Sequence, residues 1–374
     1  MIDKTYNKFN KIKVCHFVSG LKAGGVESMI YNYCSKLNKN KYEFHLVYQH
    51  EPSQKNVDEF TKIGFKLHRI PYKVKHPLKN YIESKKYLKN NNIDVVHCHM
   101  TLMNFIPLLA AKKLDIKKRI CHSHNCDVRE KNVIIKLIEK ILKKINIMLS
   151  TDLLACGEDA GKYLYSNKKF VVLKNALDLD KFKFNNEVRK KIRNFYNIEN
   201  NEILVGHIGR FTNQKNHEFI ISIADKLINN EKNKKIKFIL IGDGNNKQSI
   251  EQSIVEKKLE KSVLLTGVVD NTNEFYSSFD CFILPSLWEG LPVVGIEAQV
   301  SKLQCFFSNK IDKNVKIEKN VEFIDIDNIN EWCNKIKQIQ FYERNSDLSK
   351  FKSNGLDIKT EIYKLDNIYS GGLE

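Results

Sequence analysis

The alternation of short apolar runs with longer amphipathic stretches limits this sequence to one class of fold. The runs are rich in β-branched and aromatic residues, which favour strands, and the stretches between them are long enough for helices. A strand, a helix and a second strand in succession form a parallel pair with a right-handed crossover. Strands are therefore predicted at residues 13–19, 43–49, 65–70, 94–99, 119–124, 152–156 and 170–175, and again at 203–209, 237–242, 263–267, 281–285, 304–308 and 321–326.

This pattern predicts an α/β protein with two Rossmann-like, doubly wound domains that face a central cleft. A chain of 374 residues is longer than one hydrophobic core usually supports, which agrees with two domains. The polar, charge-dense stretch 174–202 separates the two sets of strands. We expect an N-terminal domain at 1–173, a C-terminal domain at 174–350, and a segment at 351–374 that packs back on the N-terminal domain.

The net charge of +18 is concentrated in the first half of the chain. Residues 1–172 contain 32 Lys and Arg against 15 Asp and Glu, whereas the remainder contains 30 against 29. This excess of positive charge in the first half favours an anionic partner: lipid headgroups, a phosphorylated substrate or nucleic acid. No helix-turn-helix, zinc-finger or RNP-like segment accompanies the charge, so nucleic acid is the poorest choice. A solvated surface in a lysine-rich composition explains the charge equally well.

The ends of the chain and its cysteines favour a cytoplasmic protein. The N-terminus "MIDKTYNKFNKIK" lacks the apolar core of a signal peptide. The longest apolar run, 105–111, is far shorter than the ~20 residues that span a bilayer. Nine cysteines without a CxxC pair are typical of reduced thiols.

Residues 132–150, "NVIIKLIEKILKKINIMLS", have apolar side chains at helical spacing with lysines beside them. A basic amphipathic helix of this kind can lie in an anionic membrane surface. The same pattern also describes a helix that packs on a sheet and exposes a lysine face. Both interpretations stay open, and the first implies peripheral attachment to the inner face of the plasma membrane.

Ligands bind doubly wound sheets at the carboxyl ends of the strands, so residues that follow strands are the first site candidates. In "SGLKAGGVES" (19–28), Gly24 and Gly25 precede a helix and allow an anion to approach its N-terminus, although ordinary turns also use such a pair. Gly242, in "LIGDGNNKQ" (240–248), lies in another strand-to-helix turn. That turn lacks the full GxGxxG pattern of nicotinamide-cofactor sites.

Two cations and two carboxylates follow strands of the second set. Arg210 and Lys215, in "HIGRFTNQKNH" (207–217), are placed to neutralise a diphosphate, although basic surface residues are common in a basic protein. In "SLWEGLPVVGIEAQ" (286–299), Pro292 marks a helix start, which places Glu289 in the loop before the helix and Glu297 within it. Carboxylates accept hydrogen bonds from sugar diols. We expect Glu289 to hold a donor sugar, Glu297 a ribose, and the helix N-terminus a phosphate.

Histidines end two strands of the first set, in "HCH" (97–99) and "CHSHN" (121–125). Alternation places His97 and His99 on one face, and His122 and His124 on one face. Nearby cysteines permit a zinc site, but no spacing matches a common one. We expect polar residues lining an acceptor site, with core histidines as the alternative.

The chain resembles the retaining, family 4-type glycosyltransferases of the GT-B fold, over most of its length. Glu289 and Glu297 match that family's E-x7-E pattern, and "GRFTNQK" (209–215) matches its G-R-x4-K diphosphate clamp. "GGVE" (24–27) resembles its glycine loop, and "LKNALDLDKF" (173–182) its inter-domain segment. In "SKLQC" (301–305), Lys302 and Gln304 replace the usual Gly and Pro. Members with these motifs assemble bacterial capsule, exopolysaccharide or lipopolysaccharide sugars.

The resemblance implies retaining transfer from a nucleotide sugar, with a UDP-sugar as the expected donor, without metal or cofactor. The catalytic residues would be His124, Glu289, Arg210 and Lys215, of which His124 matches a family histidine near the transferred sugar. Donor-binding residues would be Gly24, Gly25, Arg210, Lys215, Gly242, Gly267, Glu289, Gly290, Leu291, Pro292 and Glu297. The acceptor side would contain His99, His124 and Asn125, and the acceptor would be a glycan or a lipid-linked oligosaccharide.

Other functions remain open at this stage. The altered 301–305 loop allows a non-catalytic GT-B partner subunit, and a sugar-nucleotide epimerase shares the fold. Asp178 and Asp180 form a D-x-D, which binds a metal–nucleotide complex in the other major glycosyltransferase fold. Its position in the inter-domain segment favours a turn instead.

Overall fold

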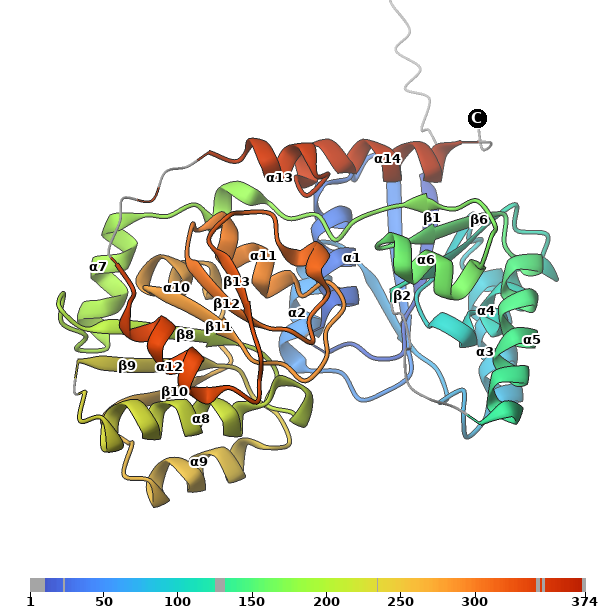
Figure 1. Ribbon diagram of the computed structural model, residues 1–374. Coiled ribbons are helices and arrows are strands. Elements are labelled where there is room, and N and C mark those ends of the chain that lie inside the picture. Colours follow the sequence, from blue (N-terminus) through green and yellow to red (C-terminus); the bar gives the residue numbers. More distant parts are fainter. Residues whose placement is uncertain are drawn as a thin grey trace, which may run out of the picture. The chain divides into compact units, whose positions relative to one another are not determined.

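A computed structural model describes residues 11–22, 24–124, 132–233, 235–340, 344 and 347–371 (Figure 1). It contains two separate sheets in which every pairing between named strands is parallel. All the strands predicted from the sequence are present. The two doubly wound domains expected from the βαβ pattern are confirmed.

The first sheet has seven strands in the order β3-β2-β1-β4-β5-β6-β7. Its strands are β1 (Ile12–Phe17), β2 (Tyr42–Tyr48), β3 (Lys66–Arg69), β4 (Val95–Cys98), β5 (Lys118–Ser123), β6 (Asp152–Ala155) and β7 (Val171–Val172). The helices that accompany it are α1 (Gly25–Lys36), α2 (Gln54–Lys62), α3 (Pro77–Asn90), the 3-10 helix η1 (Thr101–Asn104), α4 (Phe105–Lys112), α5 (Val133–Leu149), α6 (Glu158–Tyr165) and α14 (Ile358–Ser370).

The second sheet has six strands in the order β10-β9-β8-β11-β12-β13. Its strands are β8 (Ile203–Ile208), β9 (Ile236–Ile241), β10 (Val263–Gly267), β11 (Cys281–Leu284), β12 (Gln304–Ser308) and β13 (Val321–Ile324). The helices are α7 (Asn186–Phe195), α8 (His217–Asp225), α9 (Lys247–Glu256), α10 (Thr272–Ser278), α11 (Val293–Val300), α12 (Ile329–Lys337) and α13 (Ser349–Ser353). Short 3-10 helices are η2 (Leu179–Phe182), η3 (Asn213–Lys215) and η5 (Lys313–Val315), and the π-helix η4 (Lys226–Asn230) extends α8.

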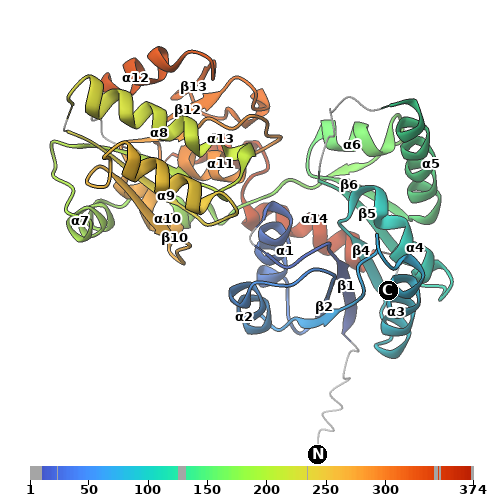
Figure 2. The same cartoon turned by 90° about the horizontal axis from the view of Figure 1, so that it is seen from below.

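The chain divides into two compact units. Unit 2 is Leu177–Asp357, and unit 1 contains the residues before it together with those from Ile358 on. Helix α14 therefore returns to unit 1, where Leu365 and Tyr369 are buried in the same hydrophobic cluster as Val14 of β1. Figure 2 shows α14, in red, beside the blue elements α1 and β1.

Both faces of each sheet are buried, which explains why the strands are almost continuously apolar in sequence. In unit 1, the cluster on one face includes residues of α1 and α14, and the cluster on the other includes residues of α4 and α6. In unit 2, residues of α10 and α11 pack on one face and residues of α8 and α9 on the other.

Helix α5 packs only in part. Asn146 and Leu149 are buried near its C-terminal end, but Ile134 is 71% exposed and Met148 is 67% exposed. Further exposed apolar residues of α5 are Val133, Ile135, Leu137, Ile138 and Ile141. Most of the predicted apolar stripe is thus solvent-accessible rather than buried against the sheet. No helix among the described residues is long and apolar enough to cross a membrane.

Candidate active site

The strand order of unit 2 reverses between β8 and β11, so the loops that follow these two strands are neighbours. The chain proceeds from β8 to β9 on one side and reaches β11 on the other, so these two strands are neighbours at the point where the strand order reverses. Doubly wound sheets bind their ligands at such a point, outside the carboxyl ends of the strands. The predicted residues Arg210, Lys215 and Glu289 all belong to these two loops.

Hydrogen bonds join the two loops directly. The backbone N–H of Leu287 donates to the carbonyl of Gln214 at 2.8 Å, and the side-chain amide of Gln214 donates to the carbonyl of Trp288 at 2.8 Å. The residues that follow β8 and those that follow β11 therefore form one surface.

Lys215 and Glu289 form an ion pair between these two loops. Lys215 Nζ lies 2.5 Å from Glu289 Oε1, and the two side chains are 16% and 12% exposed. The hydroxyl of Ser286 donates to the same carboxylate oxygen at 3.0 Å. A pair with so little exposure is weakly screened by solvent, so each partner strongly orients the other. Arg210, at the start of the same loop, is exposed.

The loop after β9 requires glycine because it passes over the residue before Arg210. Gly242 has a φ of +147°, and a Cβ atom there would lie 2.0 Å from the carbonyl oxygen of Gly209. Gly267 has a φ of +70°, and its carbonyl accepts a hydrogen bond from the N–H of Gly242 at 3.0 Å. The two glycines predicted for this edge thus shape the loops at the carboxyl ends of the strands.

Helix α11 begins as predicted, with Pro292 as its N-cap and Val293 as its first residue. Glu289 lies in the loop before it, where its carbonyl accepts from the N–H of Asp312 at 3.2 Å. Gly290 has open space around its Cα, and Leu291 packs on the core of unit 2.

Glu297 is half-buried on α11, and its carboxyl group accepts a hydrogen bond from the hydroxyl of Tyr276 at 2.7 Å. Burial raises the pKa of Glu297 to about 7, and the tyrosine hydrogen bond opposes part of that increase. This carboxyl group is thus desolvated, and among the described residues the Tyr276 hydroxyl donates a hydrogen bond to it. A ribose diol would supply further donors.

In unit 1, Gly24 is the N-cap of α1, and Gly25 is its first residue. Glu27 lies in the first turn as expected, and its carboxylate lies close to Gly24. The structure thus confirms the predicted strand-to-helix turn, and an anion site at this turn stays a prediction.

The strand-end histidines of unit 1 lie together. The rings of His97 and His99 are 4.2 Å apart between centroids, and those of His122 and His124 are 4.0 Å apart, as alternation predicts. His124 Nε2 lies 2.8 Å from His99 Nδ1. Both His99 and His124 are therefore engaged with each other. Asn125, predicted beside them, lies outside the described residues.

Two histidine triplets have nitrogens close enough to hold a metal ion. The first triplet is His16, His97 and His99, and the second is His99, His122 and His124. In each triplet the candidate ligand atoms lie within 4.8 Å of one another.

The two acids of the D-x-D segment lie apart from these histidines in the sequence. Asp178 is the N-cap of η2, and Asp180, within η2, pairs with Lys183 at 2.7 Å. The interpretation of D-x-D as a turn is confirmed.

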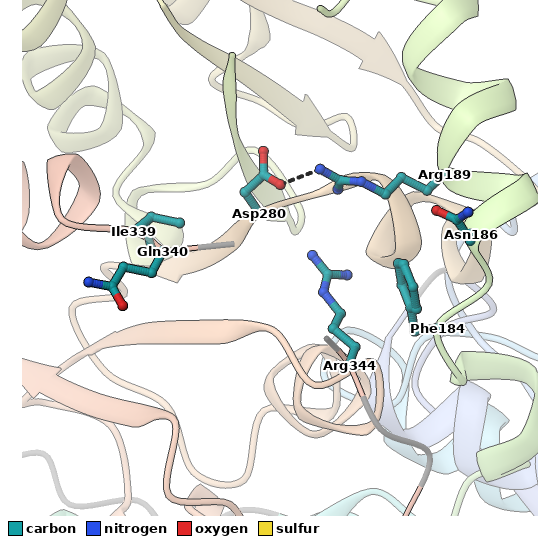
Figure 3. A pocket seen from close by; sticks show the side chains of 7 residues that line it. All are labelled: Phe184, Asn186, Arg189, Asp280, Ile339, Gln340 and Arg344. Atoms are coloured by element: carbon teal, nitrogen blue, oxygen red, sulfur yellow. Dashed lines mark hydrogen bonds and ion pairs between the residues drawn. The ribbon is translucent and has the colours of Figure 1, made fainter. Parts of the chain in front are cut away.

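A separate hollow of unit 2 contains an arginine-rich ion network (Figure 3). Arg189 and Asp280 point toward each other there and are joined at 2.6 Å. Asp280 also pairs with the buried Arg193 at 3.0 Å and accepts from the N–H of Leu204 at 2.7 Å. Because Asp280 precedes β11, this hollow lies at the amino ends of the strands, opposite the edge that binds ligands. The lining residues are Phe184, Asn186, Arg189, Asp280, Ile339, Gln340 and Arg344.

A second hollow adjoins the predicted site. It is lined by Thr212, Asn213, Asn216, His217, Glu218, Asn246 and Leu287, which surround the loop that carries Lys215. Sequence reasoning missed this lining, and it also missed Ser286 and Tyr276, which bind the two predicted carboxylates. No local signal marks these residues, because their roles depend on contacts between distant segments.

In the altered loop after α11, the side chain of Lys302 has a charged partner within unit 2. Lys302 has a φ of +55°, which explains why glycine suits this position. Its ammonium group pairs with Glu318 at 2.7 Å, and both side chains are largely buried. Lys302 therefore has a structural contact that offsets the strained backbone.

Family models match both units. The model described as "Glycosyl transferases group 1" matches residues 188–355, and the model described as "Glycosyltransferase Family 4" matches residues 23–181. The first range lies within unit 2, and the second lies almost entirely within unit 1.

Curated relatives span nearly the same length. The chain is 31% identical to the putative glycosyltransferase EpsF of Bacillus subtilis over 312 residues, covering 81% of this chain and 80% of EpsF. It is 30% identical to the capsular polysaccharide biosynthesis glycosyltransferase CapH of Staphylococcus aureus, covering 96% and 98%. A third relative, 25% identical with coverage of 96% and 97%, is the UDP-Gal:alpha-D-GlcNAc-diphosphoundecaprenol alpha-1,3-galactosyltransferase of Escherichia coli.

Among solved structures, HepE of Anabaena in complex with UDP and glucose superposes with a TM-score of 0.77. The match covers 96% of this chain and 99% of HepE at 14% identity. At that identity the likeness shows a shared fold.

Proposed function

The chain belongs to the glycosyltransferases of group 1 and family 4 and has their GT-B fold, and from this premise we propose that it transfers a sugar from a UDP-sugar with retention of configuration. The acceptor is a glycan or a lipid-linked oligosaccharide of a bacterial surface polysaccharide. Two relatives support this class of acceptor: CapH is a glycosyltransferase of capsular polysaccharide biosynthesis, and the Escherichia coli galactosyltransferase is named for a sugar linked to diphosphoundecaprenol.

One observation supports the proposal most: the partly buried ion pair of Lys215 and Glu289 at the reversal point of unit 2. Without a donor, Glu289 neutralises and orients Lys215. When a nucleotide sugar binds, its diphosphate attracts the ammonium group of Lys215, and Arg210 adds a second cation. The carboxylate of Glu289, still held by Ser286, then accepts hydrogen bonds from the hydroxyls of the transferred sugar.

The chemistry is electrostatic stabilisation of the leaving diphosphate. Arg210, Lys215 and the N-terminus of α11 offer positive charge and N–H groups where negative charge develops as the sugar departs. The acceptor hydroxyl attacks the same face that the diphosphate leaves, which retains configuration. These residues supply the stabilisation, so the proposal requires no metal.

The remaining predicted residues of unit 2 bind the donor in this proposal. Glu297 and Tyr276 bind the ribose, and the glycine loops at Gly242 and Gly267 leave room for the nucleotide. Gly290, Leu291 and Pro292 form the turn under the donor. For unit 1, donor binding by Gly24 and Gly25 and acceptor binding by His99, His124 and Asn125 stay predictions from the sequence.

Helix α5 extends the proposal to the membrane. Its exposed apolar residues alternate with Lys136, Lys140 and Lys144, and an amphipathic helix of this composition binds an anionic lipid surface. We propose that the enzyme attaches peripherally to the inner leaflet through α5, at the surface where a lipid-linked acceptor resides.

Donor screening with matched variants tests the transfer. The purified protein is incubated with a panel of UDP-sugars, and hydrolysis or transfer is measured with and without a chelator. We expect turnover that survives the chelator and falls on the order of 100-fold in Lys215→Met and Glu289→Gln. Nuclear magnetic resonance of the first product then reports the anomeric configuration, and inversion contradicts retaining transfer.

A second ion pair of unit 2 provides the controls. Lys237 and Glu202 are paired at 3.7 Å with side chains 20% and 11% exposed, but they lie at the amino ends of β9 and β8. Lys237→Met and Glu202→Gln should keep wild-type turnover. If the wild type turns over no nucleotide sugar, the result supports a non-catalytic GT-B partner subunit. If the wild type only epimerises the sugar nucleotide, the result supports a sugar-nucleotide epimerase.

A further inference from the structure

Four buried histidines, the half-buried His124 and one tyrosine form a continuous hydrogen-bonded network on one face of the unit 1 sheet. His16 comes from β1, His97 and His99 from β4 and its end, and His122 and His124 from β5 and its end. Tyr369, from α14, closes the network from the opposite end of the sequence. We call this set the histidine network.

The first branch runs through three histidines. The hydroxyl oxygen of Tyr369 lies 3.3 Å from His16 Nε2. His16 Nδ1 lies 3.0 Å from His99 Nε2, and His99 Nδ1 lies 2.8 Å from His124 Nε2. His124 Nδ1, at the end of the branch, is buried and has no hydrogen-bond partner among the described residues.

The second branch starts at the same hydroxyl and is shorter. Tyr369 lies 2.8 Å from His97 Nδ1, and His97 Nε2 lies 3.1 Å from His122 Nδ1. His122 Nε2, at the end of this branch, is also buried and has no hydrogen-bond partner among the described residues. Each branch therefore ends in one unused ring nitrogen near the carboxyl ends of the strands.

Every ring in the network is neutral. Burial lowers the pKa of His16 and His124 to about 3, and it holds the pKa of His97, His99 and His122 well below the ordinary range. Burial also raises the pKa of Tyr369, which keeps its proton. At neutral pH each histidine thus carries one ring proton, and the tyrosine hydroxyl carries one.

Because each neutral ring carries one proton, all the hydrogen bonds within one branch run in the same direction. A neutral imidazole donates from one nitrogen and accepts at the other, so a donated proton at one hydrogen bond sets the sense of the next. The Tyr369 hydroxyl has one proton, and its partners among the described residues are His97 Nδ1 and His16 Nε2, so it donates into one branch and accepts from the other. When it donates to His97, all five histidines are protonated at Nε2; when it donates to His16, all five are protonated at Nδ1.

We propose that Tyr369 is a positioning residue whose single hydroxyl proton couples the two branches, so that all five histidines share one tautomer. The free ends then have opposite roles: of His124 Nδ1 and His122 Nε2, one is an N–H donor and the other is an acceptor. The C-terminal helix α14 thereby sets the protonation of His124. The value of this coupling for transfer rests on the proposed function, but the coupling itself does not.

A metal ion would give the network a different role. Metal ligation needs the nitrogen lone pairs that the hydrogen bonds already use, and both ring nitrogens of His16, His97 and His99 have partners. The geometry therefore favours the proton network over metal binding. Stoichiometric zinc in the purified protein, measured by elemental analysis, would overturn the proposal.

Proton–nitrogen correlation spectra of ring-labelled histidine distinguish the two neutral tautomers directly. In the wild-type chain we expect the five network histidines, assigned by single His→Gln substitutions, to show one common tautomer at neutral pH. A mixture of tautomers among them, or a charged ring, would overturn the coupling. This measurement needs no variant of Tyr369 and no activity.

Tyr369→Phe removes the shared hydroxyl and keeps the ring. The N–H that had donated to the tyrosine oxygen loses its acceptor, so its whole branch should reverse, while the other branch keeps its tautomer. Cys34 Sγ, 3.5 Å from His16 Nε2, is only a weak substitute acceptor. Wild-type tautomers at all five histidines in this variant would overturn the proposal.

Tyr165→Phe is the matched control. The Tyr165 hydroxyl is equally buried in unit 1 and donates toward the carbonyls of Cys121 and Leu154, away from the histidines. It should leave the five tautomers unchanged. The turnover of Tyr369→Phe tests whether the network contributes to transfer. If the tautomer of His124 changes and kcat does not fall by about tenfold or more, the network is present but His124 is not part of the mechanism.

Discussion

At the scale of single residues, the carboxylates and cations of the candidate site are bound to each other and to neutral partners. Lys215 pairs with Glu289, and Tyr276 donates to Glu297. Each contact holds a charged group in low exposure without a ligand. These groups are therefore oriented by the protein itself, and in the proposed function a substrate would compete with or add to the contacts already present.

Competition for Lys215 predicts opposite effects on binding and on transfer. In Glu289→Gln the lysine loses its charged partner and is available to the diphosphate, so UDP should bind as tightly as to the wild type or up to about tenfold tighter. Transfer should nevertheless slow, because the sugar hydroxyls lose their acceptor. Calorimetry with UDP measures the first effect, and Glu202→Gln serves as the control. Weaker UDP binding in Glu289→Gln would contradict the competition.

The raised pKa of Glu297 predicts a pH-dependent gain of stability in Glu297→Gln. Because the folded-state pKa of about 7 exceeds the ordinary value of 4.5, the folded state holds the proton more tightly than the unfolded state. Stability from this group is complete below pH 4.5 and decreases as the pH rises toward 7. Glutamine removes this loss, so the variant should be more stable at pH 8 by about 1–3 kcal/mol and little changed at pH 4.

Urea unfolding of both proteins at the two pH values measures this difference. The same variant should bind UDP more weakly, because the amide accepts ribose hydrogen bonds less strongly than a carboxylate. An equal stability difference at both pH values would show that Glu297 ionises normally in the folded chain.

At the scale of elements, loops at the carboxyl ends of strands and one helix carry the features that bear on function. The loops after β8 and β9 approach so closely that only glycine fits at residue 242. Helix α5, by contrast, leaves most of its apolar stripe uncovered. The two elements therefore predict different kinds of sensitivity to substitution.

Gly242→Ala should destabilise unit 2 by more than about 2 kcal/mol. The new Cβ atom would meet the carbonyl of Gly209, and the backbone conformation disfavours any L side chain. Gly290→Ala is the control within the same site, because nothing lies within 4 Å of a Cβ there and its φ is not positive. Chemical denaturation compares the two, and equal losses would contradict the close approach of the loops.

Attachment through α5 predicts charge-dependent liposome binding. Lys136→Glu with Lys140→Glu should reduce cosedimentation with anionic vesicles several-fold, since each lysine near the surface contributes about 1 kcal/mol. Lys190→Glu with Lys191→Glu makes the same charge change on α7 of unit 2 and should have little effect. Equal losses from both pairs would assign binding to net charge rather than to α5, and Ile134→Ser with Ile138→Ser tests the apolar contribution.

At the scale of the whole molecule, the sheets of the two units share the same kind of strand order, and helix α14 packs on unit 1. Both sheets place the first and fourth strands of the unit side by side, which gives each sheet the reversal of strand order at which doubly wound sheets generally bind ligands. Leu365 and Tyr369 of α14 join the core of unit 1 although all of unit 2 precedes them in sequence.

Leu365→Ala should therefore destabilise unit 1 and leave unit 2 unchanged. A buried leucine truncated to alanine costs about 2–5 kcal/mol. Leu303→Ala, equally buried in unit 2, should do the reverse. Hydrogen exchange read by mass spectrometry reports each unit separately. Loss of protection in unit 2 upon Leu365→Ala would contradict this assignment of α14.

The sequence by itself determined the α/β class, the strands and the residues at their ends. Periodicity, turn residues and helix starts are local properties, and the motif residues Arg210, Lys215, Glu289 and Glu297 could be identified from them. The family resemblance was likewise visible in short segments, and the comparisons confirmed it.

Only the tertiary structure decided which of these groups meet. Glu289 binds Lys215 because β8 and β11 are neighbours, and Tyr369 reaches His16 because α14 returns to unit 1 across 353 residues of sequence. The apolar stripe of α5 had two interpretations in sequence, since an amphipathic pattern is the same whether its face meets a sheet or remains uncovered. Contacts between distant segments depend on strand order and packing, and no local pattern encodes either.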